Sequence, residues 1–201
     1  MEKLKYHHGN LRNDMIQNGL KLLTNKGYEE FSLRKVAKMC GVSHTTPYKH
    51  FKNKDDLICA IISEGTEKFK KSLEKISLEH TTDFKAQVLE LGKKYIKFMV
   101  ENPDYFKLLL MDNLSNKVFI CNHNLLCIKG DSFDSFRKSA LNYLNSVKGC
   151  RSNEELNLSI ISLWSTIHGL AIMLTNKTLV YSGDYLDLVD KILSRNLSIE
   201  A

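Results

Sequence analysis

The chain has 201 residues, of which 43% are hydrophobic and 26% charged, a composition typical of an ordinary soluble globular protein with one generous domain or two smaller ones. No uninterrupted apolar run approaches the roughly 18 residues of a membrane span, and the first residues lack the apolar core of a signal peptide, so we expect a cytoplasmic protein without a membrane partner. The five cysteines are odd in number and scattered, which favours reduced thiols over a disulfide framework.

Positive charge is concentrated at the start of the chain. Residues 1–54 hold 11 Lys and Arg against 4 Asp and Glu, a net charge of +7, whereas residues 55–201 hold 18 against 19, a net charge of −1. Four of the seven histidines also lie in the first segment. A basic segment joined to a neutral one suggests a head that binds a polyanion, either nucleic acid or a membrane surface. A solvated lysine-rich face is the alternative.

Capping residues and apolar spacing predict three helices in the basic segment. Asn10, Ser32 and Ser43 are each suited to the N-cap position, and a glycine follows each of the first two apolar stretches, where a helix commonly ends. The third helix would have about two turns. The predicted helices cover residues 10–27, 32–41 and 43–51.

The rest of the chain also has the pattern of helices with short connections. Asn53 can cap a long fourth helix with acidic residues in its first turn, and Ser152-x-x-Glu155 is a capping-box pattern before a long apolar helix. Residues 113–130 give no clear signal, so we expect a loop or a broken helix there. No strand is convincing, and the predicted fold class is all-α. The predicted helices begin near residues 53, 82, 103, 131, 152 and 184.

The second and third predicted helices are joined by a turn of about three residues. This is the arrangement of a helix-turn-helix, whose second helix places its first side chains in the major groove of DNA. Threonine can contact a base edge or the thymine methyl group, and lysine pairs best with guanine acceptors. The candidate base readers are His44, Thr45, Thr46 and Lys49, the candidate phosphate contacts are Tyr48, His50 and Lys54, and Arg34 suits either role. The same pattern also occurs in helical proteins that do not bind DNA.

Pro47 lies inside the predicted third helix, as its fourth residue. Only one intrahelical donor is lost at this position, so we expect the helix to tolerate the proline. Pro47 and Phe51 are four residues apart, and we expect them to be buried together against the first helix.

The same region resembles the DNA-binding domain of the TetR family of bacterial transcription regulators. The similarity covers roughly residues 7–60 and rests on "GYEEFSLRKVAKMCGVS" and on "YKHFKNKDDL", which is similar to the family's tyrosine–x–histidine–phenylalanine signature with a following lysine. The resemblance implies three DNA-binding helices, a linking fourth helix, and further helices that bind a small ligand and dimerise. It places Arg34 with the base readers named above. Pro47 departs from the leucine usual at its position, which puts the tilt of the recognition helix in doubt.

Residues 164–169, "WSTIHG", are similar to a tryptophan–x3–histidine–glycine motif found in one subset of TetR-type C-terminal domains. Trp164 and His168 would share a helix face. One interpretation is the wall of a ligand pocket, with His168 as a hydrogen-bonding anchor or protonation switch. The other, which the sequence favours, is a core histidine, with Gly169 allowing a tight helix crossing or a dimer contact. The expected lining of a pocket is Tyr95, Phe98, Met99, Phe106, Leu110, Phe119, Trp164 and Met173.

No cofactor, metal site or catalytic site is predicted. The stretch "CNHNLLC" offers Cys121, His123 and Cys127, with Cys150 as a further thiolate, but the C-x-H-x3-C spacing matches none of the usual structural zinc sites. His7 and His8 could add phosphate contacts from an N-terminal arm. The chain has no phosphate-binding glycine loop and no Gly-x-Ser-x-Gly elbow, so we do not expect an enzyme.

The favoured hypothesis is a homodimeric transcription regulator, a repressor by family resemblance, that a mainly hydrophobic small molecule releases from a near-palindromic operator in double-stranded DNA. Residues 1–54 would form the DNA-binding domain and residues 55–201 the ligand-binding and dimerisation domain, with dimer contacts through residues 152–175 and 184–196. The alternative is an all-helical module that binds a small molecule or a protein and carries a vestigial DNA-binding head.

Overall fold

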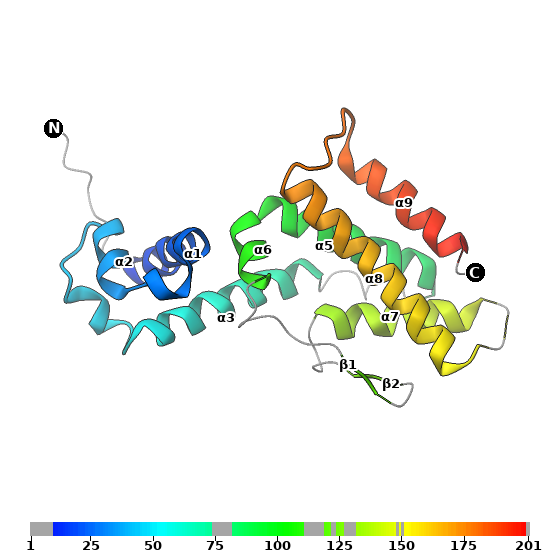
Figure 1. The fold of residues 1–201 in the computed structure, drawn as a ribbon, viewed down its shortest axis with the longest axis horizontal. Coiled ribbons are helices and arrows are strands. Elements are labelled where there is room, and N and C mark those ends of the chain that lie inside the picture. Colours follow the sequence, from blue (N-terminus) through cyan, green and yellow to red (C-terminus); the bar gives the residue numbers. More distant parts are fainter. Residues whose placement is uncertain are drawn as a thin grey trace. The chain divides into compact units, whose positions relative to one another are not determined.

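The structure is a computed structural model, and it describes residues 10–73, 82–110, 119–121, 124–126, 132–147, 149 and 151–199. The chain divides into two compact units. The first contains residues Met1–Lys68 and Asp104–Asp112, and the second contains Phe69–Pro103 and Asn113–Ala201. Helices predominate in both units, which confirms the predicted all-α fold class (Figure 1).

The first unit contains α1 (Leu11–Glu30), α2 (Leu33–Met39), the 3₁₀ helix η1 (Thr46–Lys49), most of α3 (Lys54–Leu73) and most of α6 (Pro103–Leu109). Its core consists of apolar side chains from all of these elements. Gly19 and Gly65 allow close packing: a methyl group on Gly65 would lie 2.6 Å from the ring of Tyr105. The buried residues include Met15, Leu23, Phe31, Val36, Phe51, Leu57, Ile61 and Phe106.

The capping residues of the first two helices behave largely as the sequence predicts. Ser32 accepts a hydrogen bond from the Lys35 backbone N–H at 3.3 Å, which satisfies one of the free donors at the start of α2. Asn10 occupies the N-cap position of α1 but makes no side-chain capping bond. Gly27 has φ 76° and ψ 175°, so α1 kinks there before its last turn ends at Glu30.

The predicted third helix is wrong in length and type. The structure has only the four-residue η1, capped by Thr45 rather than Ser43. Its hydrogen bonds run from the N–H of residue i to the carbonyl of residue i−3, as from Thr46 to Ser43 at 3.0 Å and from His50 to Pro47 at 2.9 Å. The physical reason is Pro47, which has no N–H to donate to Ser43 in an α-helical pattern, so the Thr46 N–H takes that carbonyl instead.

The second unit is built around α5 (Phe84–Glu101), which packs against α7 (Ser132–Ser146), α8 (Asn153–Thr175) and α9 (Tyr185–Ile199) (Figure 1). Gly92 of α5 makes this packing close, because a methyl group there would lie 2.7 Å from Leu193 of α9 and 3.1 Å from Ile167 of α8. Asp83 caps α5, and Ser152 and Glu155 form the predicted capping box of α8.

The region expected to be a loop or broken helix contains a short β-hairpin. Strands β1 (Phe119–Cys121) and β2 (Asn124–Leu126) are antiparallel, with Phe119 opposite Leu126 and Cys121 opposite Asn124. Three-residue strands are too short to give a clear alternating pattern in the sequence, which explains why the strands were not predicted.

Helix α8 is long and apolar enough to cross a membrane by length and composition alone, with a mean hydropathy of 1.6 over its most apolar window. Counting only uninterrupted apolar residues, as the sequence analysis did, misses this helix because polar residues interrupt the run. The core helix of a soluble protein meets the same criterion. Residues Ile160, Leu163 and Ile167 of α8 are buried inside the second unit.

We predict that Ser152→Ala lowers the melting temperature by about 2–4 °C, because the substitution removes the hydroxyl that caps the first turn of α8. Thermal unfolding monitored by circular dichroism at fixed protein concentration measures this effect. Ser162→Ala, at an exposed position inside the same helix, is the matched control and should leave the melting temperature unchanged or raise it slightly. An equal loss in both variants would contradict the capping role of Ser152.

Candidate functional site

Helix α2 and the turn after it form the first half of a helix-turn-helix. Leu33, Val36 and Ala37 are buried and anchor α2, and Arg34 lies on its exposed side. The helix ends in a Schellman motif: Val42 N–H donates to the Ala37 carbonyl at 3.0 Å, and Gly41 N–H donates to the Lys38 carbonyl at 3.1 Å. Gly41 has φ 69°, a conformation that glycine adopts without strain. The chain therefore turns sharply from α2 toward η1.

The turn that contains η1 brings most of the predicted DNA-binding residues together. His44, Thr45, Tyr48, Lys49 and His50 are all exposed, whereas Thr46 is partly covered. Tyr48 is 55% exposed, which is unusual for so large an aromatic side chain in a free surface turn. The structure thus presents an imidazole, a hydroxyl, a phenol and an ammonium group on one short turn.

Three hydroxyl groups at this turn bond to one another. Ser43 Oγ lies 3.0 Å from Thr45 Oγ1 and 2.8 Å from Thr46 Oγ1. This network replaces the helix-capping bond predicted for Ser43, and it fixes the orientation of both threonines. A base edge approaching Thr45 or Thr46 would meet hydroxyls that are already positioned, with their methyl groups available for thymine.

Burial of Pro47 and Phe51 holds this turn on the unit, as predicted. Pro47 is buried within η1, and Phe51 is 2% exposed. The guanidinium carbon of Arg12, in the first turn of α1, lies 5.3 Å from the centroid of the Phe51 ring. Sequence reasoning did not select Arg12. The available signal was a cation in the first turn of a basic head.

Lys54, the first residue of α3, lies against an aromatic ring. Its ammonium nitrogen is 3.8 Å from the centroid of the Tyr28 ring, and the Tyr28 hydroxyl donates to Asp55 Oδ1 at 2.8 Å. This hydrogen bond to a carboxylate raises the pKa of Tyr28. Asn53 accepts from the Asp56 backbone N–H at 2.9 Å and caps α3, as predicted. Tyr28 was not selected from the sequence as a functional residue.

Comparisons with known proteins agree with this geometry. Residues 16–61 match the family model described as bacterial regulatory proteins, tetR family. By this N-terminal domain, the chain belongs to the TetR family.

Two relatives and one solved structure illustrate the similarity. An uncharacterised HTH-type transcriptional regulator of Haemophilus influenzae is 30% identical over 118 residues, covering 58% of this chain and 60% of that protein. A fatty acid metabolism regulator protein of Bacillus subtilis is 27% identical over 81 residues, covering 40% of this chain and 42% of that protein. The chain therefore spans about half the length of these curated relatives. A TetR-family transcriptional regulator structure from H. influenzae is 21% identical, with a TM-score of 0.63 over 94% of this chain and 95% of that one.

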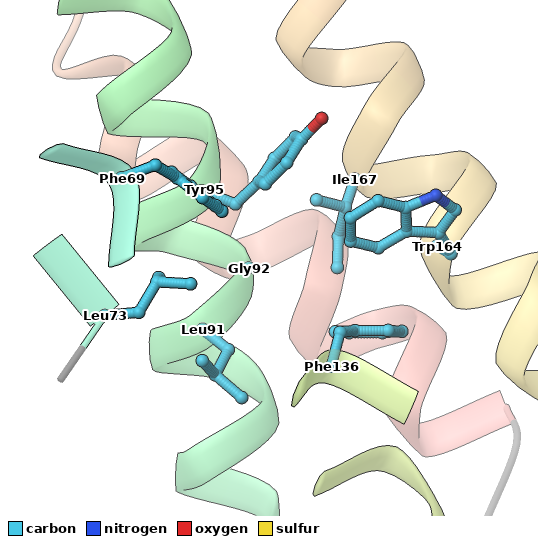
Figure 2. A pocket seen from close by; sticks show the side chains of 8 residues that line it. All are labelled: Phe69, Leu73, Leu91, Gly92, Tyr95, Phe136, Trp164 and Ile167. Carbon is cyan, nitrogen blue, oxygen red and sulfur yellow. The ribbon is translucent and has the colours of Figure 1, made fainter. Parts of the chain in front are cut away.

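The second unit of this TetR-family chain contains a small, mostly apolar cavity (Figure 2). The space open to the centre of a water molecule is about 10 Å³, which is room for about one water. Of the predicted lining residues, only Tyr95 and Trp164 line this cavity. Figure 2 shows side chains from α3, α5, α7 and α8 around the space. The lining residues are Phe69, Leu73, Leu91, Gly92, Tyr95, Phe136, Trp164 and Ile167.

The other predicted lining residues lie elsewhere. Phe106 and Leu110 belong to the first unit, and Met173 is 42% exposed on α8. Phe98 and Met99 are buried in the second unit without lining the cavity, and the side chain of Phe119 lies outside the described residues. Helical periodicity identified apolar residues correctly but could not assign them to one of two cores.

Trp164 and His168 do share a helix face, and both pack on Tyr95. The Trp164 and His168 rings are stacked with centroids 6.1 Å apart, and Trp164 meets the Tyr95 ring edge-on at 5.0 Å. The Tyr95 hydroxyl and His168 Nδ1 share a hydrogen bond of 2.8 Å. Burial raises the pKa of Tyr95 and lowers the pKa of His168, so both side chains are favoured in their neutral forms.

Gly169 does not serve a helix crossing within the described part of the chain. A methyl group on this glycine would meet nothing within 4 Å. The close approach that the sequence suggested for Gly169 occurs instead at Gly92 of α5.

Several weaker candidates fall outside the described residues: His7, His8, His123, Cys127, Cys150 and the side chain of Cys121. Within the described ranges, no group of three or more His, Cys, Asp or Glu side chains is arranged to hold a metal ion. Cys40 and Cys59 are free thiols, and Cys40 is buried.

We predict that His168 makes folding stability fall as the pH drops below about 6.5. The imidazole has its ordinary pKa of 6.5 in the unfolded chain and a lower pKa in the folded protein. Above pH 6.5 it is neutral in both states and its titration contributes nothing; below pH 6.5 the unfolded chain takes up the proton first. This group can therefore lower the free energy of unfolding by no more than about 1.4 kcal/mol per pH unit.

Urea unfolding of the wild type and of His168→Gln between about pH 7.5 and pH 5 measures this contribution. The stability of the wild type relative to His168→Gln should decrease toward low pH. Tyr95→Phe is the control, because it removes the hydrogen bond to His168 but keeps the titrating imidazole. Parallel pH profiles for the wild type and His168→Gln would contradict the prediction.

Proposed function

We propose that the protein is a DNA-binding transcription regulator of the TetR family, most simply a repressor that acts on a near-palindromic operator. The observation that carries this proposal is the exposed turn at residues 44–50, which follows a Schellman-capped helix and presents His44, Thr45, Tyr48 and Lys49 together. A helix-turn-helix places these positions in the major groove of DNA. Relatives that are described as HTH-type regulators support the same function.

The charge distribution supports DNA as the polyanion. The net charge of +7 in residues 1–54 stands beside a net charge of −1 in the rest of the chain. In our proposal, Arg34, Thr45, Thr46 and Lys49 read bases, and Tyr48, His50 and Lys54 bind phosphates. We place the functional boundary after residue 54, with the remaining residues serving ligand binding and dimerisation.

We further propose that two copies associate through α8 and α9. Leu158 is 61% exposed and Met173 42% exposed on α8, and Ile199 at the end of α9 is 72% exposed. Gly169, with open space beside it, could receive a side chain of a second copy. A two-fold dimer would set the two heads about one helical turn of DNA apart.

The effector in this proposal is a mainly hydrophobic small molecule. The cavity beside Tyr95 and Trp164 is lined almost wholly by apolar groups, and the Tyr95–His168 pair supplies a polar group nearby. A relative described as a fatty acid metabolism regulator is in keeping with an effector of this character. Because the cavity has room for only about one water, ligand binding requires the aromatic side chains to move apart.

The alternative is an all-helical binding module with a vestigial DNA-binding head. Retention of a cationic, exposed turn on a well-capped scaffold favours the regulator. The relatives are regulators, and we propose no catalytic activity and a cytoplasmic location.

We predict that selection of random duplexes by the purified protein recovers a palindrome. Lys54→Ala should weaken binding to all duplexes alike, since a phosphate contact carries no sequence information. Thr46→Ala and Lys49→Ala should relax the base preference at one position in each half-site, with a discrimination loss of about 1–3 kcal/mol. Fluorescence anisotropy against the recovered duplex and its single-base variants measures both effects. Equal effects of all three substitutions on specific and random duplexes would refute the assignment of readers.

We predict a dimer at micromolar concentration. Sedimentation velocity should give twice the mass of the 23.1 kDa chain, and Leu158→Glu, which places a charge in the proposed contact, should shift the protein toward monomer. Val180→Glu, at a position that is 84% exposed outside the two helices, is the matched control and should leave the dimer intact. A monomeric wild type would count against recognition of a palindrome.

A further inference from the structure

The cation expected to bind phosphate at the start of α3 is held by an aromatic face rather than by a carboxylate. Lys54 Nζ lies 3.8 Å from the Tyr28 ring centroid. Within the described ranges, Lys54 has no ion pair with an Asp or Glu side chain, although two acidic residues directly follow it. An aromatic face attracts an ammonium group through its quadrupole but brings no opposite charge. A lysine held in this way keeps its full positive charge for a phosphate.

The two neighbouring carboxylates have other hydrogen-bond partners. Asp55 Oδ1 accepts from the Tyr28 hydroxyl at 2.8 Å, and Asp56 Oδ2 accepts from the Lys52 backbone N–H at 2.9 Å. Tyr28 therefore contacts both the cation and an adjacent anion, with its ring face on Lys54 and its hydroxyl on Asp55. The hydrogen bond to Asp55 also fixes the direction of the ring, so that its face stays under the ammonium group.

Tyr28 is suited to this role by its place in the chain. It follows Gly27, whose positive φ kinks α1 and redirects the chain, and it remains 40% exposed. A tyrosine at the surface that is not needed to fill the core is free to serve a neighbouring group.

We propose that Tyr28 is a positioning residue for DNA binding, which holds the Lys54 ammonium in place for a phosphate contact without neutralising it. The proposal rests on the proposed function, because it assumes that Lys54 meets DNA. Loss of the ring should free the long lysine side chain, so that ordering it against a phosphate costs more conformational entropy. The contact would then be weaker while the protein remains folded.

The experiment measures the affinity of the full chain for one labelled duplex of fixed random sequence and for the duplex recovered by selection, over a range of salt concentrations. Lys54→Ala should reduce the slope of log affinity against log salt by about 0.9. Tyr28→Leu should weaken binding about two- to fivefold and reduce the same slope by a smaller amount. Tyr28→Phe, which keeps the ring face, should restore most of the affinity. In the Lys54→Ala background, Tyr28→Leu should have no further effect.

Matched controls separate this role from a general effect on folding. Tyr181→Leu replaces another tyrosine that is 40% exposed, and Lys70→Ala replaces an exposed lysine further along α3; neither should change the salt slope. The melting temperature of each variant is measured in parallel. If Tyr28→Leu lowers the melting temperature but leaves the salt slope unchanged, or weakens binding equally with and without Lys54, then Tyr28 is only structural and the proposal is overturned.

Failure of the proposed function has a different outcome. If the wild type retains neither duplex at low salt, the DNA-binding assignment itself is wrong. If Lys54→Ala changes affinity and slope while Tyr28→Leu changes neither, the regulator assignment stands and only the role of Tyr28 is refuted.

Discussion

A four-residue 3₁₀ turn forms too few internal hydrogen bonds to keep its own shape, so the DNA-facing surface of this protein depends on how that turn is attached to the helices around it. The attachment is the burial of Pro47 and Phe51 in the first unit. Pro47 restricts the backbone inside the turn, and Phe51 anchors its end. The Schellman motif after α2 directs the chain into the turn. Every exposed reader from His44 to His50 takes its position from these few contacts.

A second constraint acts on charge. A DNA-binding head must present cations that are fixed in place yet not neutralised, and carboxylates would fix them only by cancelling their charge. In this head, the acidic residues at the start of α3 accept hydrogen bonds from a tyrosine hydroxyl and a backbone N–H, while Lys54 and Arg12 lie over the rings of Tyr28 and Phe51. Aromatic faces thus do the work of positioning, and acidic side chains cap the helix.

The second unit follows a different logic, because its central feature is a nearly closed aromatic cluster. Trp164 lies against Tyr95, Phe133 and Phe136, with ring centroids 5.0 to 5.3 Å apart. Its polar element is the buried hydrogen bond between Tyr95 and His168, which holds both groups in their neutral forms. A cluster of this kind can shift to an open state only if a ligand repays the lost ring contacts, which makes the aromatic cluster the natural element for a ligand to act on.

The sequence by itself determined what depends on local chemistry. The caps at Ser32, Asn53 and Ser152, the kink at Gly27 and the all-α fold class follow from the conformational preferences of single residues and from helical spacing, and the structure confirms them. The concentration of positive charge, and with it the candidate DNA-binding residues, could be read in the same way.

Only the tertiary structure decided what depends on packing between distant segments. The length of the reading helix was misjudged because the effect of Pro47 depends on which carbonyl its neighbour takes. The pocket lining was assigned to Phe106 and Leu110 because periodicity marks a side chain as buried without saying in which core. The roles of Tyr28 and Arg12 were missed for the same reason. A cation over a ring leaves no spacing signal in the sequence, since Lys54 meets Tyr28 and Arg12 meets Phe51 only after the chain has folded.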